Sequence, residues 1–229
     1  QQKMPPPSPS SPSPPPPPKK KKSDYIRTAT QNYISRNATI HGATNFETKG
    51  KSILAPNVIV HGDYDGSIIR IGRYCFLDEG VVLRPSVVPK SNDPLMVVKD
   101  SDDNNPDDDN DVRRPSEHET SLPLLIGSHT HIGSNTIVQS VSIGSCVRIG
   151  SNCTLSARSK IHDCCIIEDG AVIPPDMVVP PFSRVRSSTG RSGSSLTSNG
   201  RIVGTLPECC GGEFVEGCVQ EYLKFVNEL

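Results

Sequence analysis

The chain has 229 residues, of which 34% are hydrophobic and only 4% aromatic, and it contains no Trp. This length and hydrophobic content fit one folded domain with polar tails better than two separate cores. The formal net charge of −1 gives no overall basic field for nucleic acid, and no apolar run is long enough to insert directly into a membrane. No signal-peptide pattern precedes the Pro-rich start, so we expect a cytoplasmic protein whose eight cysteines are reduced thiols.

Residues 1–22 consist mainly of Pro, Ser and Lys, with Met4 as the one large apolar residue. Such a segment buries too little surface to offset its ordering entropy, so we expect a disordered Pro/Lys-rich tail with polyproline II character at Pro14–Pro18. The tail is either a solvated arm or a ligand for a proline-recognising domain, in which case Lys19–Lys22 would assist binding. We expect residues 23–229 to form the single folded domain.

A large apolar residue returns every six positions from Ile34 onward. One step of seven residues precedes Ile53, and Asp65 interrupts a later hexad. The members of this first series are Ile34, Ile40, Phe46, Ile53, Ile59, Ile71, Leu77 and Leu83. A helix would need apolar spacings of three and four, and a simple strand a spacing of two, so a period of six predicts a solenoid of short, flat, three-sided coils.

Residues 89–121 interrupt the repeat with a dense run of aspartates between Asp100 and Asp111. The charge prevents packing, so we expect a mostly disordered acidic loop that leaves the solenoid at one corner. A calcium loop is not predicted, because the fixed Gly and the terminal Glu of that motif are absent.

The period returns at Ile126 and continues to Val185, with one five-residue step placed before Ile137. These members, which we call anchors together with the first series, are Ile126, Ile132, Ile137, Ile143, Ile149, Leu155, Ile161, Ile167, Ile173, Val179 and Val185. Gly follows several anchors, as in Ile126-Gly127 and Ile143-Gly144, where we expect the chain to turn a corner.

A second series of slender residues lies four positions after most anchors. Its members are Cys75, Val81, Val87, Thr130, Thr136, Val147, Cys153, Ser159, Cys165, Ala171, Met177 and Ser183. Positions an even number apart on a strand share a face, so large and small side chains should alternate inside a narrow prism. Cys75, Cys153 and Cys165 are then core fillers. The adjacent pairs Cys164-Cys165 and Cys209-Cys210 point to opposite faces and do not predict a zinc site.

The carboxy-terminal part should close the solenoid. Two proline pairs, Pro174-Pro175 and Pro180-Pro181, belong at corners because proline cannot donate to a strand ladder. Residues 187–199 are predicted to be a flexible Ser/Gly-rich insertion. Residues 213–229 are predicted to form an amphipathic helix that packs along the wall or covers the end. Its apolar face would contain Val215, Cys218, Val219, Tyr222 and Val226.

The fold alone leaves function open, because solenoids of this kind include acyltransferases, carbonic anhydrases and non-catalytic scaffolds. His61-Gly62-Asp63 resembles a turn of the gamma-class carbonic anhydrases, but the three zinc-histidine positions of that pattern fall on Arg84, Ser134 and Gln139. Those side chains cannot replace three neutral imidazoles, so we expect no metal.

An acyltransferase would need a histidine placed as a general base. The candidates by residue type are His129, His131 and His162, and no carboxylate lies at a supporting spacing in the sequence. His129 and His131 flank the inward Thr130, so both should point outward to solvent or a partner. The sequence therefore predicts no catalytic residue, metal or cofactor site. The alternatives are a hexapeptide-repeat acyltransferase and a gamma-carbonic-anhydrase-like protein that lacks its zinc ligands.

Three stretches make the chain resemble the dynactin subunit five family. The first is Lys22-Ser23-Asp24-Tyr25-Ile26 with Thr28-Ala29 and Ser35-Arg36. The second runs from Ile143-Gly144-Ser145 to Asn152-Cys153 and includes Lys160, Asp163-Cys164-Cys165 and Val178-Val179-Pro180-Pro181-Phe182; the third is Leu206-Pro207-Glu208-Cys209. The Pro/Lys tail, the longer acidic loop and the Ser/Gly insertion depart from the family pattern.

The resemblance implies an all-β, left-handed parallel β-helix with a carboxy-terminal α-helix. It also implies a non-catalytic scaffold of the dynactin pointed-end complex in the cytoplasm and cytoskeleton. The implied partners are a second β-helical dynactin subunit, the actin-related protein at that end and dynein cargo adaptors, with a role in microtubule-based transport. Arg70, Arg73, Arg84 and Arg148 are candidate partner contacts, because exposed arginines are common in protein interfaces.

Overall fold

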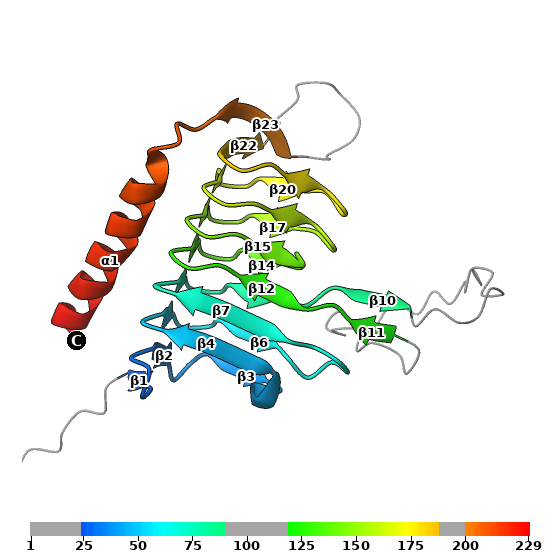
Figure 1. Ribbon diagram of the computed structural model, residues 1–229. Coiled ribbons are helices and arrows are strands. Elements are labelled where there is room, and N and C mark those ends of the chain that lie inside the picture. Colours follow the sequence, from blue (N-terminus) through cyan, green and yellow to red (C-terminus); the bar gives the residue numbers. More distant parts are fainter. Residues whose placement is uncertain (1–23, 90–118, 188–199) are drawn as a thin grey trace, which may run out of the picture.

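A computed structural model describes residues 24–89, 119–187 and 200–229. The described chain forms a left-handed parallel β-helix with one carboxy-terminal α-helix along its side, as the repeat and the resemblance predict. The coils stack along one axis, and the helix stands beside them (Figure 1). The predicted tail, most of the acidic loop and most of the Ser/Gly insertion lie outside the described residues.

Three sheets, here called A, B and C, form the walls of the prism. Sheet A contains β1 (Tyr25–Arg27), β2 (Tyr33–Ser35), β5 (Ile53–Leu54), β8 (Phe76–Leu77), β13 (His131–Ile132), β16 (Arg148–Ile149), β19 (Ile166–Ile167), β22 (Ser183–Ser187) and β23 (Gly200–Thr205). Sheet B contains β3 (Thr39–His41), β6 (Ile59–His61), β9 (Val82–Leu83), β14 (Ile137–Val138), β17 (Thr154–Leu155) and β20 (Val172–Ile173). Sheet C contains β4 (Phe46–Gly50), β7 (Ile69–Arg73), β12 (Leu124–Ile126), β15 (Ser142–Ile143), β18 (Lys160–Ile161) and β21 (Val178–Val179).

The chain visits the walls in the order A, B, C, so each coil pairs in parallel with the coils above and below. Two antiparallel strands break this rule, because β1 pairs with β2 at one end and β23 pairs with β22 at the other. Both cover an edge of sheet A. The sequence reasoning missed β23, which directly follows the predicted Ser/Gly insertion.

The core consists of three ladders of inward side chains, one for each wall. All are aliphatic except Thr48, which takes the ladder position two residues after the predicted anchor Phe46. On sheet A the ladder runs Ile34, Leu54, Leu77, Ile132, Ile149, Ile167 and Val185; on sheet B Ile40, Val60, Leu83, Val138, Leu155 and Ile173; on sheet C Thr48, Ile71, Ile126, Ile143, Ile161 and Val179. The slender residues Cys75, Thr130, Cys153, Cys165 and Ala171 are buried as predicted. The alternation of large and small inward side chains is therefore confirmed, but the placement of Val87 was wrong, because this half-buried residue begins a strand outside the prism.

Three predicted anchors are wrong by one position. Ile137 is 41% exposed and its neighbour Val138 is fully buried, so the five-residue step lies between Val138 and Ile143. Leu54 and Val60 likewise replace Ile53 and Ile59 on the inner ladders. In each case two branched apolar residues are adjacent, and the spacing alone did not identify the inward one.

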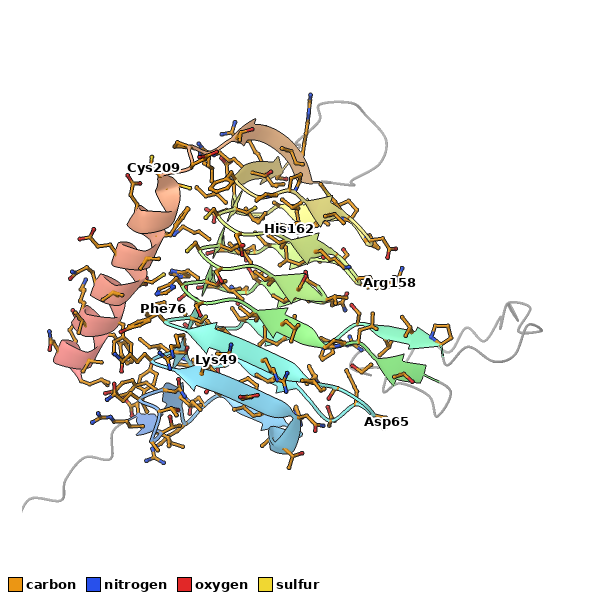
Figure 2. The ribbon with its side chains drawn as sticks, viewed as in Figure 1. Lys49, Asp65, Phe76, Arg158, His162 and Cys209 are labelled. Carbon is orange, nitrogen blue, oxygen red and sulfur yellow. The ribbon has the colours of Figure 1, made fainter. Side chains whose placement is uncertain are left out.

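All irregular steps between anchors fall on one edge of the prism, where sheet B passes to sheet C. Steps from A to B and from C to A are six residues in every coil, but eleven residues separate Val60 from Ile71 and five separate Val138 from Ile143. The interruption that contains the acidic segment leaves from this same edge. Figure 2 labels Asp65 and Arg158 along it.

The predicted loop at 89–121 is shorter than expected, because its two ends pair. Strands β10 (Val87–Pro89) and β11 (Glu119–Ser121) form an antiparallel ribbon that projects from the B–C edge (Figure 1). A short 3-10 helix, η1 (Ala43–Asn45), lies at the same edge of the first coil. Insertions at this edge leave the three inner ladders in register.

The glycines that follow the anchors serve close packing between coils rather than an unusual backbone conformation. A Cβ on Gly127 would lie 2.4 Å from the carbonyl carbon of Gly144 in the next coil. Neither glycine is among the residues with positive φ. These glycines are therefore needed because neighbouring coils approach too closely for a Cβ, and not because a corner requires positive φ.

Helix α1 (Cys210–Glu228) begins three residues earlier than predicted and packs on the wall formed by sheet A. Cys218 and Tyr222 are buried, and Phe225 and Val226 pack beside them. Val215 is 36% exposed, so its placement on the apolar face was wrong. The helix covers a wall, not an end.

A pair of matched substitutions tests the register of the core. Ile132→Ala should lower the free energy of unfolding by about 2–5 kcal/mol, because the residual cavity adds to the lost transfer energy. Ile137→Ala should cost about 1 kcal/mol or less, because that side chain already lies at the surface. Urea unfolding followed by circular dichroism measures both, and equal losses would contradict the register.

Candidate functional site

The three walls of the solenoid present different outer faces, and the outer face of sheet A is largely covered. Tyr33, Ile53 and Phe76 stack up this face and pack against Cys218 and Tyr222 of α1. The Tyr222 hydroxyl donates a hydrogen bond of 2.9 Å to the carbonyl of Gln31. Figure 2 shows Phe76 between the solenoid and the helix. Aromatic packing therefore fixes the helix to the first coils.

His131 continues this row and joins the solenoid to the helix by charge. Its Nε2 lies 3.0 Å from Oδ2 of Asp78 on the neighbouring coil, and its Nδ1 lies 3.4 Å from Oε2 of Glu221 on α1. Burial alone would lower the pKa of His131, but the contacts with the two carboxylates outweigh burial and raise this pKa to about 9. His131 is therefore an imidazolium at neutral pH, and its partner is a segment of the same chain.

The histidines that an acyltransferase would need do not form a catalytic group. A protonated His131 cannot accept a proton as a general base. His129 stacks on Tyr74 with ring centroids 5.4 Å apart, and burial lowers its pKa. His162 is exposed on the outside of sheet C, away from both. The sequence did not indicate the carboxylates beside His131, because Asp78 and Glu221 are distant from it along the chain.

The positions of the carbonic anhydrase pattern do not all meet, since two of them are neighbours and the third lies on another wall. Arg84 and Gln139 follow paired strands of sheet B, whereas Ser134 follows a strand of sheet A. Within the described residues, no group of three His, Cys, Asp or Glu side chains is arranged to hold a metal ion. His61 instead stacks between His41 and Tyr64, at centroid distances of 5.3 and 6.1 Å.

The central outward ladder of sheet B is built from uncharged side chains, and Arg84 follows β9 at the margin of this face. The ladder is Thr39, Ile59, Val82, Ile137, Thr154 and Val172, all of which are β-branched. Because β-branched side chains are stiff, they form a firm, flat surface. Ile137 at its centre is 41% exposed. We call this ladder the B face.

The outer face of sheet C is mixed in character. Its outward ladder is Glu47, Arg70, Leu125, Ser142, Lys160 and Val178. Arg70 Nε donates to Oε2 of Glu47 at 3.0 Å, and both side chains are exposed, so the pair adds little stability. Leu125 is 40% exposed.

The four arginines singled out from the sequence do not converge. Arg70 lies on sheet C, Arg84 follows a strand of sheet B, and Arg148 lies on sheet A. Arg73 ends β7 at the edge between sheets C and A. A shallow pocket of about 410 Å³ contains Arg148, together with arginines 184 and 186, which both bind Glu168. Whether any of the four contacts a partner stays a prediction.

The core cysteines lie where the repeat predicts them, whereas the sequence did not predict that three other cysteines would meet at the surface. Burial raises the pKa of the Cys75 thiol to about 12, which fits an inert core filler. Cys164 points away from the core, as expected beside inward Cys165, and interacts with Cys146 and Cys210. No sequence pattern indicated this cluster, because its members come from two coils and the helix.

A model of the family described as "Dynactin subunit 5" matches residues 109–228, which is more than half of the chain. The chain belongs to the dynactin subunit 5 family. Dynactin subunit 5 of Dictyostelium discoideum is 39% identical over 64 residues, which cover 28% of this chain and 31% of that protein. The resemblance stated from the sequence is therefore confirmed, and the chain is a member of a family of dynactin components.

Solved structures share the hexapeptide-repeat fold with this family member. One is a hexapeptide transferase family protein from Anaplasma phagocytophilum, with 11% identity, 88% of this chain and 95% of that chain covered, and a TM-score of 0.44. Another is a mutant of perosamine N-acetyltransferase from Caulobacter crescentus, with 13% identity, coverage of 76% of this chain and 56% of that chain, and a TM-score of 0.46. At these values the likeness carries no inference about function.

The described part of the chain contains no helix that is both long enough and apolar enough to span a membrane.

The charged contact of His131 predicts a pH dependence. Because its pKa is higher in the folded protein than the usual value of about 6.5, the contact stabilises fully below pH about 6.5 and is lost as pH rises towards about 9. Both carboxylates are about 40% exposed, so we expect a loss of about 1–2 kcal/mol rather than the full value of the shift.

Urea unfolding of the wild type and of His131→Gln at several pH values measures this loss. The stability difference between the two proteins should shrink as the pH rises from about 6 to about 9, because His131 loses its proton over this range. A difference that is constant with pH would show that His131 is not charged in the folded protein.

Proposed function

We propose that this dynactin subunit is a non-catalytic scaffold of the pointed-end complex, which displays flat β-helical walls to other proteins. The observation that carries the proposal is the B face, an uncharged outward ladder of sheet B on a member of a dynactin subunit family. A scaffold needs no catalytic residue. The histidines agree with this role, since His131, the most buried of those in the described residues, forms a charged contact with α1.

The B face is proposed to bind the second β-helical dynactin subunit. The strands of any parallel β-helix repeat at about 4.8 Å, so two such walls match in spacing over their whole length. A ladder without charges can be buried without leaving an unpaired ion along its length. The A wall is occupied by α1, and the ribbon β10–β11 projects from the B–C edge, so a partner would reach sheet B from the A–B side.

The remaining partners follow from the family alone and are proposed as such. They are the actin-related protein at the pointed end and dynein cargo adaptors, in the cytoplasm and on microtubules. In this proposal the rigid solenoid positions partners relative to one another and supports cargo attachment. Arg84, at the margin of the B face, and Arg70, Arg73 and Arg148 on the other surfaces remain candidate contacts.

Affinity purification of the tagged chain from a cell extract tests the scaffold role. We expect the other pointed-end dynactin subunits, identified by mass spectrometry, to be recovered with it. Purified protein should also show no acetyl transfer from acetyl-CoA to amine or hydroxyl acceptors. A chain recovered alone, or a histidine-dependent acetyl transfer, would contradict the proposal.

A matched pair of substitutions tests the B face. Ile137→Arg places a charge at the centre of the face and should reduce recovery of the second β-helical subunit at least about tenfold, or about 1.4 kcal/mol. Leu125→Arg is the control, because Leu125 is equally exposed on sheet C. Thermal unfolding should show both variants folded, and equal losses of recovery would argue against sheet B as the interface.

A further inference from the structure

A basic pocket lies at the edge where sheets C and A meet, near the first coils. Its volume is about 340 Å³, and it is lined by the turn at residues 29–31, the segment 49–51 that leaves β4, and Arg73 and Tyr74 after β7. Figure 2 labels Lys49 at this part of the molecule. Neither the repeat nor the family comparison draws attention to the pocket.

The lining carries three positive charges and, among the described residues, no carboxylate. The cations are Lys49, Lys51 and Arg73. Glu47 is close in sequence on β4, but it is bound to Arg70 on the outer face of sheet C. The pocket therefore keeps an excess of positive charge in a chain whose net charge is −1. Such a local excess attracts anions.

The pocket is built by close backbone packing. Gly50 has φ of 120°, and a Cβ there would lie 2.7 Å from the carbonyl oxygen of Thr30. Buried Asn32 donates to the hydroxyls of Thr30 at 2.8 Å and Thr48 at 2.7 Å. These contacts hold the turn against the end of β4, so the cationic side chains project from a fixed frame.

The aromatic residue of the pocket, Tyr74, has contacts of its own with His129 and Lys51. The ammonium of Lys51 lies 5.1 Å from the Tyr74 ring centroid, and His129 stacks on that ring at 5.4 Å with an interplanar angle of 13°. Lys51 Nζ also donates to the Tyr74 hydroxyl at 2.9 Å. His129 therefore covers one face of the ring, and Lys51 lies beside its hydroxyl edge.

We propose that this pocket binds the phosphoryl group of a phosphorylated serine or threonine on an extended segment of a partner protein. A phosphoryl group carries a charge of about −1.5 to −2 and three acceptor oxygens, which match two flexible ammonium groups and one guanidinium better than a single carboxylate does. The volume also leaves space for the side chain that bears the phosphate. This site is separate from the B face, so its failure would leave the scaffold role untouched.

Titration of the full-length, isotope-labelled chain with a phosphoserine peptide library tests the proposal. The backbone amide resonances of Thr30, Gly50 and Tyr74 should shift with the phosphorylated library and stay in place with the same library lacking phosphate. Binding should weaken as salt rises from about 50 mM to about 200 mM. A library with glutamate in place of phosphoserine and a titration with inorganic phosphate are run in parallel.

Charge-neutral variants assign the effect to the pocket. Lys49→Gln combined with Arg73→Gln should weaken phosphopeptide binding at least tenfold (about 1.4 kcal/mol). Lys160→Gln combined with Arg201→Gln removes the same charge from exposed positions elsewhere and should leave binding within about twofold. Thermal unfolding confirms that both variants are folded.

Four outcomes would overturn the proposal. The first is equal shifts with the phosphorylated and unphosphorylated libraries. The second is equal binding of the glutamate library, which would assign the pocket to acidic peptides. The last two are equal binding of inorganic phosphate alone and equal weakening of binding by the two variant pairs.

Discussion

The structure depends on the alignment of equivalent inward side chains from coil to coil. Except at Thr48 in the first coil, each coil contributes one large aliphatic residue to each wall, and slender residues such as Cys75, Thr130 and Ala171 fill the space between them. A narrow prism cannot exchange a large residue for a small one without a cavity or a clash, because protein interiors are close-packed. The same alignment fixes the backbone ladders, which pair every strand of a coil with its neighbours. Irregular steps between anchors are confined to the B–C edge, where they leave the ladders in register.

The period of six was sufficient to predict the solenoid, the inner slender residues and the interruption by the acidic segment. It failed where two branched residues are adjacent, as at Ile53-Leu54, Ile59-Val60 and Ile137-Val138, because either could face inward. The covering helix was predicted from its own apolar spacing. Its partners were not, since Asp78, His131 and Glu221 meet only when coils and helix are assembled. The basic pocket likewise joins three segments that share no motif.

The outer walls divide the surface of this dynactin subunit among different uses. Sheet A is committed to α1 through aromatic packing and the charge on His131. Sheet C carries mixed charges, and sheet B presents an uncharged ladder of stiff side chains. A repetitive core therefore supports distinct surfaces, because the outward residue of each hexad is free of packing constraints. The proposed contact of sheet B with a second β-helix and the proposed phosphoryl pocket use this freedom at separate places.

The most direct test of the account is the solvent accessibility of isoleucine methyl groups, measured by NMR with a soluble paramagnetic agent on the labelled chain. The account predicts strong broadening of the Ile137 methyl resonance and little effect on Ile132, Ile143 and Ile149, which lie on the inner ladders. In the presence of the second β-helical dynactin subunit, the Ile137 methyl group should become protected. A protected Ile137 in the isolated chain, or broadening of the inner methyl groups, would contradict the arrangement on which the rest depends.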